Sequence, residues 1–342
     1  MKALIAVFLL LLLFGCNGGE EPPPAEENIT NETEEEKPPP VDIIIEGQEN
    51  QTVEGNYTQE DEGPGENVST GMEFIYDPNQ TIGMYFMDLG ETGLHGDAVL
   101  IKKGDLDILV DAGSSQKSGE VIDFLRSRKV DDIELLISTT ADPTRYGGMK
   151  PVAKNFEIEE LWWSGLSYGD LGYEDAISEV GKETKNTYEV REGHTAELNG
   201  ITLEILNPPA NDTFQDRDND ALVVRVSDRN FSALLTSNIK TGAQGELVNN
   251  KLEKIKTRIM EAPYYGTGRG TGSIGLFLIR AEPEVMIVTG SADDSAGNGG
   301  SREPFFRLLE QYEIPAYETY VNGSVRISSR EEAYTVSYME QN

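Results

Sequence analysis

The uneven distribution of charge is the feature that most limits what this chain can fold into. Residues 17–80 hold 18 of the 61 acidic residues and only one of the 28 basic residues, Lys37. Three consecutive prolines occur twice in this segment, close to runs of Glu. A segment of this composition buries too little apolar surface to offset the entropy lost on folding. We therefore expect an acidic, disordered stalk over residues 17–80 and a single folded domain over residues 81–342.

The N-terminus has the pattern of an export signal. Met1-Lys2 precedes the apolar run 3–14, which is shorter than the roughly 20 residues needed to span a bilayer. The run closes with Leu-Phe-Gly-Cys at residues 13–16, which resembles the lipobox of prokaryotic lipoproteins, and Cys16 is the only cysteine. We expect a signal peptide over residues 1–16, a lipid on Cys16 that anchors the protein to the membrane, and a place at the cell surface. The alternative is a plain secretory signal with an incidental cysteine.

The predicted stalk also carries six Asn-x-Ser/Thr sequons. They are candidate glycosylation sites in an exported chain. The alternative is that a linker rich in Asn and Thr generates such triplets by composition alone. The six positions are Asn28, Asn31, Asn50, Asn56, Asn67 and Asn79.

Composition excludes several function classes. A formal net charge of −33 argues against a nucleic-acid partner, because such proteins need a basic face to displace counterions from phosphates. One cysteine excludes an internal disulfide framework and a cysteine-rich zinc module. The two histidines, His95 and His194, leave little material for a histidine-based metal site.

The domain alternates strand-like and helical segments, which indicates an α/β fold with two sheets packed face to face and covered by helices. Asn199-Gly200 and Asn322-Gly323 lie between strand-like runs and are typical of tight hairpins. The predicted strands are 84–89, 98–102, 106–111, 133–139, 201–206, 221–226, 232–236, 259–262, 285–288, 324–328 and 335–339. The predicted helices are 119–128, 244–255 and 304–313.

The first three strands carry a family resemblance. The stretches MYFMDLG, HGDAVLI and DILVDAGSS resemble the opening of metallo-β-lactamase-fold proteins, most of all the soluble domain of ComEC-type DNA-uptake competence proteins. The resemblance implies a four-layer αββα sandwich. The matching positions are Phe86, Asp88, Gly90, Gly96, Asp97, Ala98 and Asp111.

The resemblance also locates the family's metal motif on the stretch LLISTTADPTRYGGMKPVAKNF. Anchored on Gly147-Gly148, it places side chains other than histidine where that family has its ligands, and of these only Asp142 is a metal-competent donor. Zinc needs three or four N, S or O ligands, so the resemblance implies a site without metal and without cofactor. The vestigial-site candidates are Thr140, Asp142, Thr144, Arg145, Asn238, Tyr264 and Tyr265.

Two states of that site stay open. In one, a buried Asp142–Arg145 pair and neighbouring hydrogen bonds fill a vacated pocket. In the other, the pocket is open, Arg145 pairs with an anionic ligand, and Tyr264 and Tyr265 stack on it or hydrogen-bond to it.

Two functions also stay open. The first is a non-catalytic, surface-anchored pseudoenzyme that binds a small molecule or a protein partner. The second is a hydrolase of the phosphodiesterase or nuclease kind that uses zinc or manganese at an atypical site.

Overall fold

The computed structural model describes residues 43–45, 80–90, 96–211, 213–268, 274–291, 301–330 and 333–339. The chain divides into two units, residues 1–39 and 40–342, and all the described residues belong to the second. The predicted signal peptide, Cys16, the six sequons and His95 lie outside the described residues, so those expectations stay predictions.

The larger sheet has nine strands in the order β1-β16-β15-β2-β3-β4-β5-β6-β7. In this spatial order, the neighbours from β1 through β16, β15, β2 and β3 to β4 pair antiparallel, and the neighbours from β4 to β7 pair parallel. The bounds are β1 (Ile43–Ile45), β2 (Ile82–Phe86), β3 (Val99–Lys103), β4 (Leu106–Val110), β5 (Ile133–Ile137), β6 (Ile158–Trp163), β7 (Asn186–Glu189), β15 (Val325–Arg330) and β16 (Ala333–Tyr338).

The smaller sheet has seven strands in the order β14-β13-β12-β11-β10-β9-β8. It repeats the plan of the larger sheet, because β8 to β11 pair antiparallel and β11 to β14 pair parallel. The bounds are β8 (Thr195–Leu198), β9 (Ile201–Asn207), β10 (Val223–Asp228), β11 (Phe231–Leu235), β12 (Ile259–Glu261), β13 (Val285–Val288) and β14 (Ala316–Glu318).

The main apolar core lies between the two sheets. Alternate residues of each strand point to opposite faces, so one strand serves two layers. In β3, Val99 and Ile101 join the core between the sheets, whereas Leu100 faces the helices outside. In β11, Ala233 and Leu235 face the other sheet, and Leu234 faces outward. The alternation therefore requires a covering layer on both outer faces.

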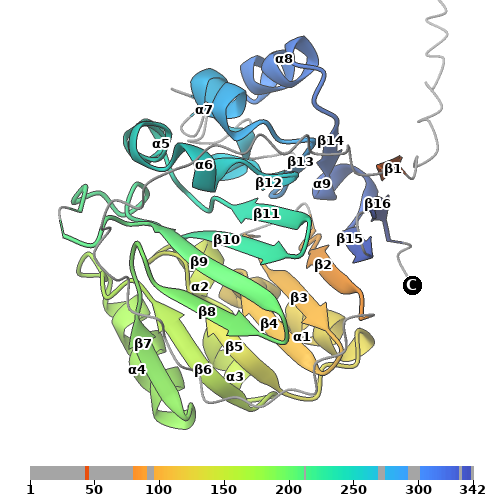
Figure 1. Ribbon diagram of the computed structural model, residues 1–342. Coiled ribbons are helices and arrows are strands. Elements are labelled where there is room, and N and C mark those ends of the chain that lie inside the picture. Colours follow the sequence, from red (N-terminus) through yellow and green to blue (C-terminus); the bar gives the residue numbers. More distant parts are fainter. Residues whose placement is uncertain are drawn as a thin grey trace, which may run out of the picture. The chain divides into compact units, whose positions relative to one another are not determined.

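Helices supply both covering layers (Figure 1). Residues of α1, α3 and α4 pack on the outer face of the larger sheet, and residues of α5 to α8 pack on that of the smaller one. The four-layer αββα prediction is thereby confirmed. The bounds are α1 (Ser118–Ser127), α2 (Pro143–Tyr146), α3 (Met149–Ala153), α4 (Leu171–Glu183), α5 (Thr241–Asn250), α6 (Leu252–Ile255), α7 (Ile274–Ala281), α8 (Glu303–Gln311) and α9 (Thr319–Asn322), with short 3₁₀ turns η1 (Ser115–Lys117) and η2 (Pro263–Gly266).

The structure contains elements that were not predicted, among them β6, β7, β8 and α4, and it differs from the prediction in three further places. The helix expected over 244–255 is broken at Lys251, whose backbone (φ −131°, ψ 29°) leaves the helical region. Asn322-Gly323 is not a hairpin: it ends α9, with Gly323 at φ 94°. Residues 43–45, which the sequence placed in the stalk, form β1 on the edge of the larger sheet. The hairpin at Asn199-Gly200 is confirmed, with both residues at positive φ between β8 and β9.

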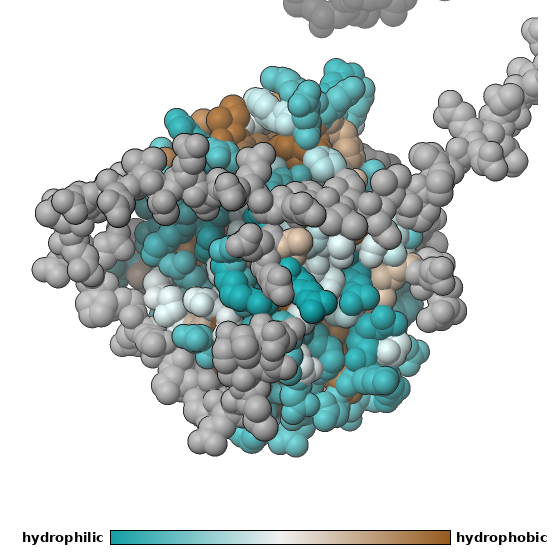
Figure 2. All heavy atoms as spheres, turned by 45° about the vertical axis from the view of Figure 1, so that its right-hand side comes forward, coloured by the Kyte–Doolittle hydropathy of each residue, from teal (hydrophilic) through white to brown (hydrophobic). Residues whose placement is uncertain are grey.

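The described surface is mostly hydrophilic in the view of Figure 2, where the apolar spheres gather near the top, on the side of α7 and α8. Leu276 and Ile279 of α7 are among the exposed large apolar side chains. Within the described ranges, no helix is both long enough and apolar enough to cross a membrane.

Candidate functional site

The predicted site residues lie at one edge of the sandwich, where parallel strands of both sheets end. Thr140, Asp142 and Arg145 follow β5, and Asn238 follows β11. Tyr265 follows β12, which runs parallel to β11. Carboxyl ends of parallel strands meet at one edge, which is where α/β folds commonly collect functional side chains.

Arg145 is the centre of this edge. Its side chain is 2% exposed and is surrounded by three buried carboxylates. Its Nη2 lies 2.5 Å from Asp97 Oδ2, and its Nη1 lies 3.1 Å from Asp111 Oδ2 and 3.5 Å from Glu261 Oε1. A guanidinium offers five N–H groups in a fixed plane, so it can face several acceptors at once. Arg145 is therefore the buried cation shared by the carboxylates of Asp97, Asp111 and Glu261.

Two of the three carboxylates, Asp111 and Glu261, also accept hydrogen bonds from residues that follow a neighbouring strand. Asp111 accepts the N–H of Thr139 at 2.8 Å and the hydroxyl of Thr139 at 2.7 Å. Glu261 Oε2 accepts the N–H groups of Thr236 at 2.8 Å and of Ser237 at 3.0 Å. The hydroxyls of Thr139 and Ser237 lie 2.7 Å apart, which links the two sheets. The carboxylates are therefore fixed in place independently of Arg145.

Asp142 does not pair with Arg145, so the self-neutralising pair that belonged to the first of the two alternatives is wrong. Asp142 is the N-cap of α2, and its Oδ1 accepts the N–H of Thr144 at 2.9 Å and the Thr144 hydroxyl at 2.7 Å. Its Oδ2 faces Arg217, at 3.2 Å, instead. The local reason is the sequence Asp-Pro-Thr: a cap followed by proline at the first helical position fixes the Asp142 carboxylate on its own helix.

Asn238 bridges Asp142 and Arg145. Its Oδ1 accepts from Arg145 Nε at 2.8 Å, and its Nδ2 donates to Asp142 Oδ2 at 3.2 Å. Both ends of the amide are used, and the Asn238 side chain is fully buried. The side chain thus joins the two acidic environments without adding charge.

Tyr264 and Tyr265 lie in the turn η2, both with positive φ (49° and 60°). The Tyr265 ring packs under the guanidinium of Arg145, 5.2 Å from its centre, and its hydroxyl lies 3.2 Å from Thr144 Oγ1. Positive φ is uncommon for bulky residues and needs external support. The buried Arg302 gives that support, since its Nε donates to the Tyr265 carbonyl at 2.7 Å.

Six of the seven predicted residues form one chain of direct contacts: Asp142, Thr144, Arg145, Asn238, Tyr264 and Tyr265. Thr140 is buried, and its hydroxyl donates to the carbonyl of Arg217 at 3.2 Å. Tyr264 contacts Tyr265 edge to face, with ring centres 6.0 Å apart. The structure therefore brings the predicted set together; its functional role stays a prediction.

Three glycines allow the backbone to pack this closely. A Cβ on Gly96, at φ 99°, would lie 1.5 Å from the carbonyl oxygen of Thr144. A Cβ on Gly148 would lie 2.0 Å from the carbonyl oxygen of Ala112, and one on Gly147 would lie 2.5 Å from that of Pro143. These glycines therefore have a packing role: Gly96 lets the loop that carries Asp97 close on α2, and Gly148 lets the start of α3 close on the loop after β4.

Burial and the neighbouring charges shift the acid–base behaviour of the centre. Burial raises the pKa of Glu261 to about 7, against the opposing effect of Arg145. Burial likewise raises the pKa of Asp111, again opposed by Arg145. Burial alone would lower the pKa of Arg145, but Asp97 and the other acidic neighbours outweigh it and raise that pKa. The guanidinium of Arg145 therefore stays charged.

The donors present at this edge do not fit a divalent metal ion. The carboxylates of Asp97, Asp111 and Glu261 already face a permanent cation, and the Asp142 carboxylate is used as a helix cap. Over the described ranges, no group of three or more His, Cys, Asp or Glu side chains has an arrangement suited to a metal ion. Placing a dication beside Arg145 would be opposed by charge repulsion.

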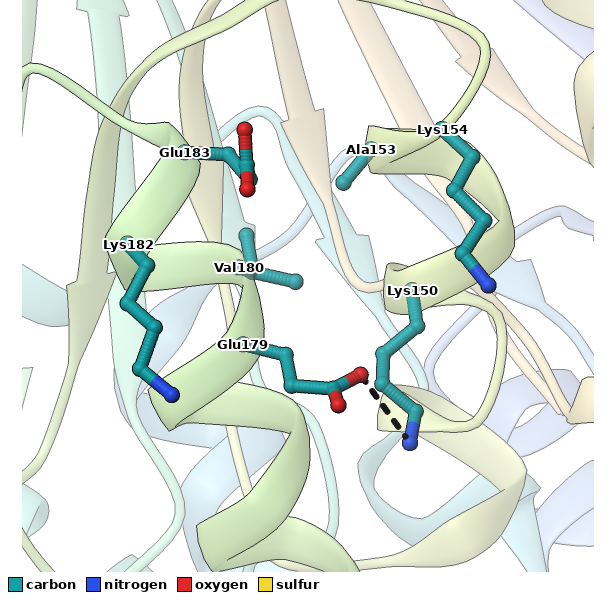
Figure 3. Close-up of a pocket in the computed structure, with 7 residues that line it drawn as sticks. All are labelled: Lys150, Ala153, Lys154, Glu179, Val180, Lys182 and Glu183. Atoms are coloured by element: carbon teal, nitrogen blue, oxygen red, sulfur yellow. Dashed lines mark ion pairs between the residues drawn. The ribbon is translucent and has the colours of Figure 1, made fainter.

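A cavity of about 360 Å³ lies elsewhere, between α3 and α4 on the outer helix layer (Figure 3). Glu179 and Lys150 form an ion pair of 3.5 Å across it, and Lys150 also contacts Asp175 at 2.6 Å. The cavity therefore does not coincide with the predicted site residues. It is lined by Lys150, Ala153, Lys154, Glu179, Val180, Lys182 and Glu183.

Sequence reasoning missed the three carboxylates that surround Arg145. Asp97 and Asp111 were matched only as positions of the strand motif, and Glu261 was not singled out. One signal was available: a buried arginine requires acidic partners, and each of these residues adjoins an apolar strand at the edge where Arg145 lies.

No family model matches the chain, and no curated protein matches it. Similar solved structures include the metallo-β-lactamase fold protein YhfI from Bacillus subtilis, at 12% identity over 71% of this chain and 99% of that one, with a TM-score of 0.48. They also include a metal-dependent hydrolase of the β-lactamase superfamily, at 10% identity over 72% and 100% of the two chains, with a TM-score of 0.48. A variant of the CmlA β-hydroxylase has 11% identity over 74% and 54%, with a TM-score of 0.47. At these identities the likeness concerns the fold alone, and the activities in those names belong to those proteins.

Proposed function

We propose that this chain is a metal-independent, non-catalytic binding protein in which the guanidinium of Arg145 takes the place of a bound cation. The observation that carries the proposal is the convergence of Asp97, Asp111 and Glu261 on Arg145. Three buried carboxylates at one sheet edge need a cation to balance their charge. Because the guanidinium of Arg145 is part of the chain, it provides that cation without a bound metal ion. Charged hydrogen bonds of this kind are stronger than neutral ones.

The burial of the centre favours a filled plug over an open ligand pocket. As whole residues, Arg145 and Asn238 are at most 1% exposed, and Tyr264 and Tyr265 are 8% and 7% exposed. Both ends of the Asn238 amide and the face of Tyr265 towards Arg145 are used within the protein. A substrate would have to displace these contacts to reach the guanidinium. The binding function therefore belongs to the outer surface, and a protein partner fits it better than a small molecule in the centre.

Membrane anchoring through Cys16 belongs to the same proposal. It is supported by the apolar run 3–14, the lipobox-like residues 13–16 and the acidic segment that follows. A lipid on Cys16 would hold the domain outside the cell, where a protein partner could reach it. Mass analysis of the N-terminal peptide tests this: a diacylglyceryl adduct on Cys16 supports it, and cleavage at another position without lipid contradicts it.

Activity assays test the non-catalytic claim. The purified full chain is assayed for phosphodiesterase, nuclease and lactonase turnover, with zinc or manganese added in separate samples, beside the variant Asp142→Ala. We expect no turnover above that of the variant under any condition. Turnover that Asp142→Ala abolishes would support the alternative, a metal-dependent hydrolase with an atypical site, and would refute the proposal.

A further inference from the structure

The cavity between α3 and α4 has charged side chains on both of its walls (Figure 3). Lys150 and Lys154 line it from α3 and the C-cap of that helix, and Glu179 and Glu183 line it from α4. Its volume of about 360 Å³ lies within the range of small-molecule pockets, which is roughly 300–1,000 Å³. The cavity is therefore large enough for a small charged molecule.

The two walls repeat the same pair of opposite charges one helical turn apart. Lys150 and Lys154 are four residues apart, as are Glu179 and Glu183, and residues at that spacing lie on one face of a helix. In the first turn, Lys150 and Glu179 form an ion pair of 3.5 Å across the cavity. In the next turn, Lys154 and Glu183 form no ion pair with each other or with any other residue in the described ranges. The second pair of charges therefore lines the cavity without being neutralised across it.

We propose that this cavity binds a free α-amino acid with an apolar side chain. The ammonium group of the ligand pairs with Glu183 and its carboxylate pairs with Lys154, so one small molecule neutralises both charges. The apolar side chain of the ligand lies on Ala153 and Val180, which line the cavity between the two helices. A simple anion is a poorer fit, because Glu179 and Glu183 repel it.

Exposure to solvent sets the strength of this binding. The side chains of Lys150 and Glu179 are 36% and 53% exposed, so charges at this surface are hydrated. A single ion pair in such surroundings changes a dissociation constant by about fivefold at most. With two such pairs and a small apolar contact, we expect a dissociation constant on the order of 1 mM for an amino acid such as leucine. The inference is independent of the proposed function, because this cavity does not coincide with the residues around Arg145.

The test measures the binding of L-leucine to the full chain by ligand-observed NMR titration. Two analogues each lack one charge of leucine: N-acetyl-L-leucine has no ammonium group, and L-leucinamide has no carboxylate. Lys154→Met and Glu183→Gln each remove one charge from the cavity. The matched controls are Lys256→Met and Glu253→Gln, which remove the two charges of an exposed ion pair at α6, in the helix layer of the smaller sheet.

We expect leucine to bind the native chain and both control variants equally, and each analogue to bind the native chain about threefold to fivefold more weakly. Lys154→Met should weaken leucine by a similar factor and leave leucinamide unchanged, because leucinamide has no carboxylate to lose a partner. Glu183→Gln should in the same way weaken leucine and leave N-acetyl-leucine unchanged. No binding of leucine to the native chain up to about 10 mM would overturn the proposal. So would losses in Lys154→Met and Glu183→Gln that are no larger than those in the controls.

Discussion

Arg145 and Asp97 form a fully buried ion pair, with 2.5 Å between Nη2 and Oδ2 and with side chains that are 2% and 1% exposed. Asp97 precedes β3, and Arg145 lies in a four-residue helix after β5. Two segments far apart in the sequence thus depend on each other's charge. Burying either charge alone would carry a large desolvation cost, so the pair ties the start of β3 to the short helix α2.

Removing the guanidinium should therefore destabilise the domain strongly. Arg145→Met leaves three buried carboxylates without a cation, and we expect a loss of about 3–5 kcal/mol of unfolding free energy. The control is Arg217→Met, because Arg217 pairs with Asp142 and Asp218 but is about one third exposed. That change should cost at most about 1 kcal/mol. Chemical denaturation of both variants measures the difference, and equal losses would mean that Arg145 is not the central cation.

The carboxylate of Asp142 should act chiefly as a helix cap. Asp142→Ala removes the acceptor for the N–H of Thr144, and we expect a loss of about 1 kcal/mol. Asp142→Asn keeps an acceptor oxygen and should therefore lower the unfolding free energy by only about 0.3 kcal/mol. Thermal unfolding of the two variants distinguishes a cap from a charge partner. If Asn were as damaging as Ala, the negative charge of Asp142, and not its cap, would be what stabilises the site.

The close approach of Gly96 to α2 gives a steric test. In Gly96→Ala, the new Cβ would meet the Thr144 carbonyl, and φ is 99°, so we expect a loss of more than about 2 kcal/mol. A Cβ on Gly119 in α1 would meet no neighbouring atom within 4 Å, so Gly119→Ala is the matched control. The control should gain about 0.4–1 kcal/mol through its lower chain entropy. Similar unfolding midpoints for the two variants would contradict this packing.

The raised pKa of the buried Glu134 side chain predicts how the unfolding free energy depends on pH. Burial raises the pKa of Glu134 to about 8, above its ordinary 4.5, so the folded protein keeps this proton where the unfolded chain releases it. The stability that Glu134 contributes is complete below about pH 4.5 and is lost as the pH rises towards 8.

Glu134→Gln removes that titration and keeps an oxygen to accept the N–H of Asp107. The native chain should therefore lose about 3–4 kcal/mol relative to this variant between about pH 5 and pH 8. Glu120→Gln, on the exposed face of α1, should run parallel to the native chain. Urea unfolding across the pH range measures the three curves. A Glu134→Gln curve parallel to the native one would show that Glu134 does not titrate in this range.

The strands of the core could be predicted because their pattern is local. Short, nearly continuous apolar runs placed β3, β4 and β11 within a residue of their observed bounds. Helix α4 was not predicted, because its buried residues Tyr173, Ala176, Ile177 and Val180 form a narrow stripe among charges. β1 was not predicted either, since a three-residue strand is stable only on a neighbour's edge. Such elements depend on tertiary contacts that a window of sequence does not contain.

The candidate site, like the fold, could be predicted only in part: the placement of its residues could be predicted, but the pairing of their side chains could not. The fold determines which residues follow the ends of its strands. The family resemblance could therefore predict that Arg145, Asn238 and Tyr265 lie at one edge. Which carboxylate faces Arg145 depends on side-chain geometry across both sheets. Asp142, the nearest acid in sequence, is held by its own helix, and Glu261, 116 residues from Arg145, faces the guanidinium instead. Proximity along the chain was therefore the wrong guide to pairing.

Metal content tests the central claim most directly. The full chain, purified without chelator and then dialysed against zinc or manganese, is measured by elemental analysis, and its thermal midpoint is recorded with and without EDTA. We expect less than about 0.1 metal ion per chain and an unchanged midpoint, because Arg145 already supplies the cation. One or two tightly bound ions per chain, with a midpoint that EDTA lowers, would contradict the claim that Arg145 takes the metal's place.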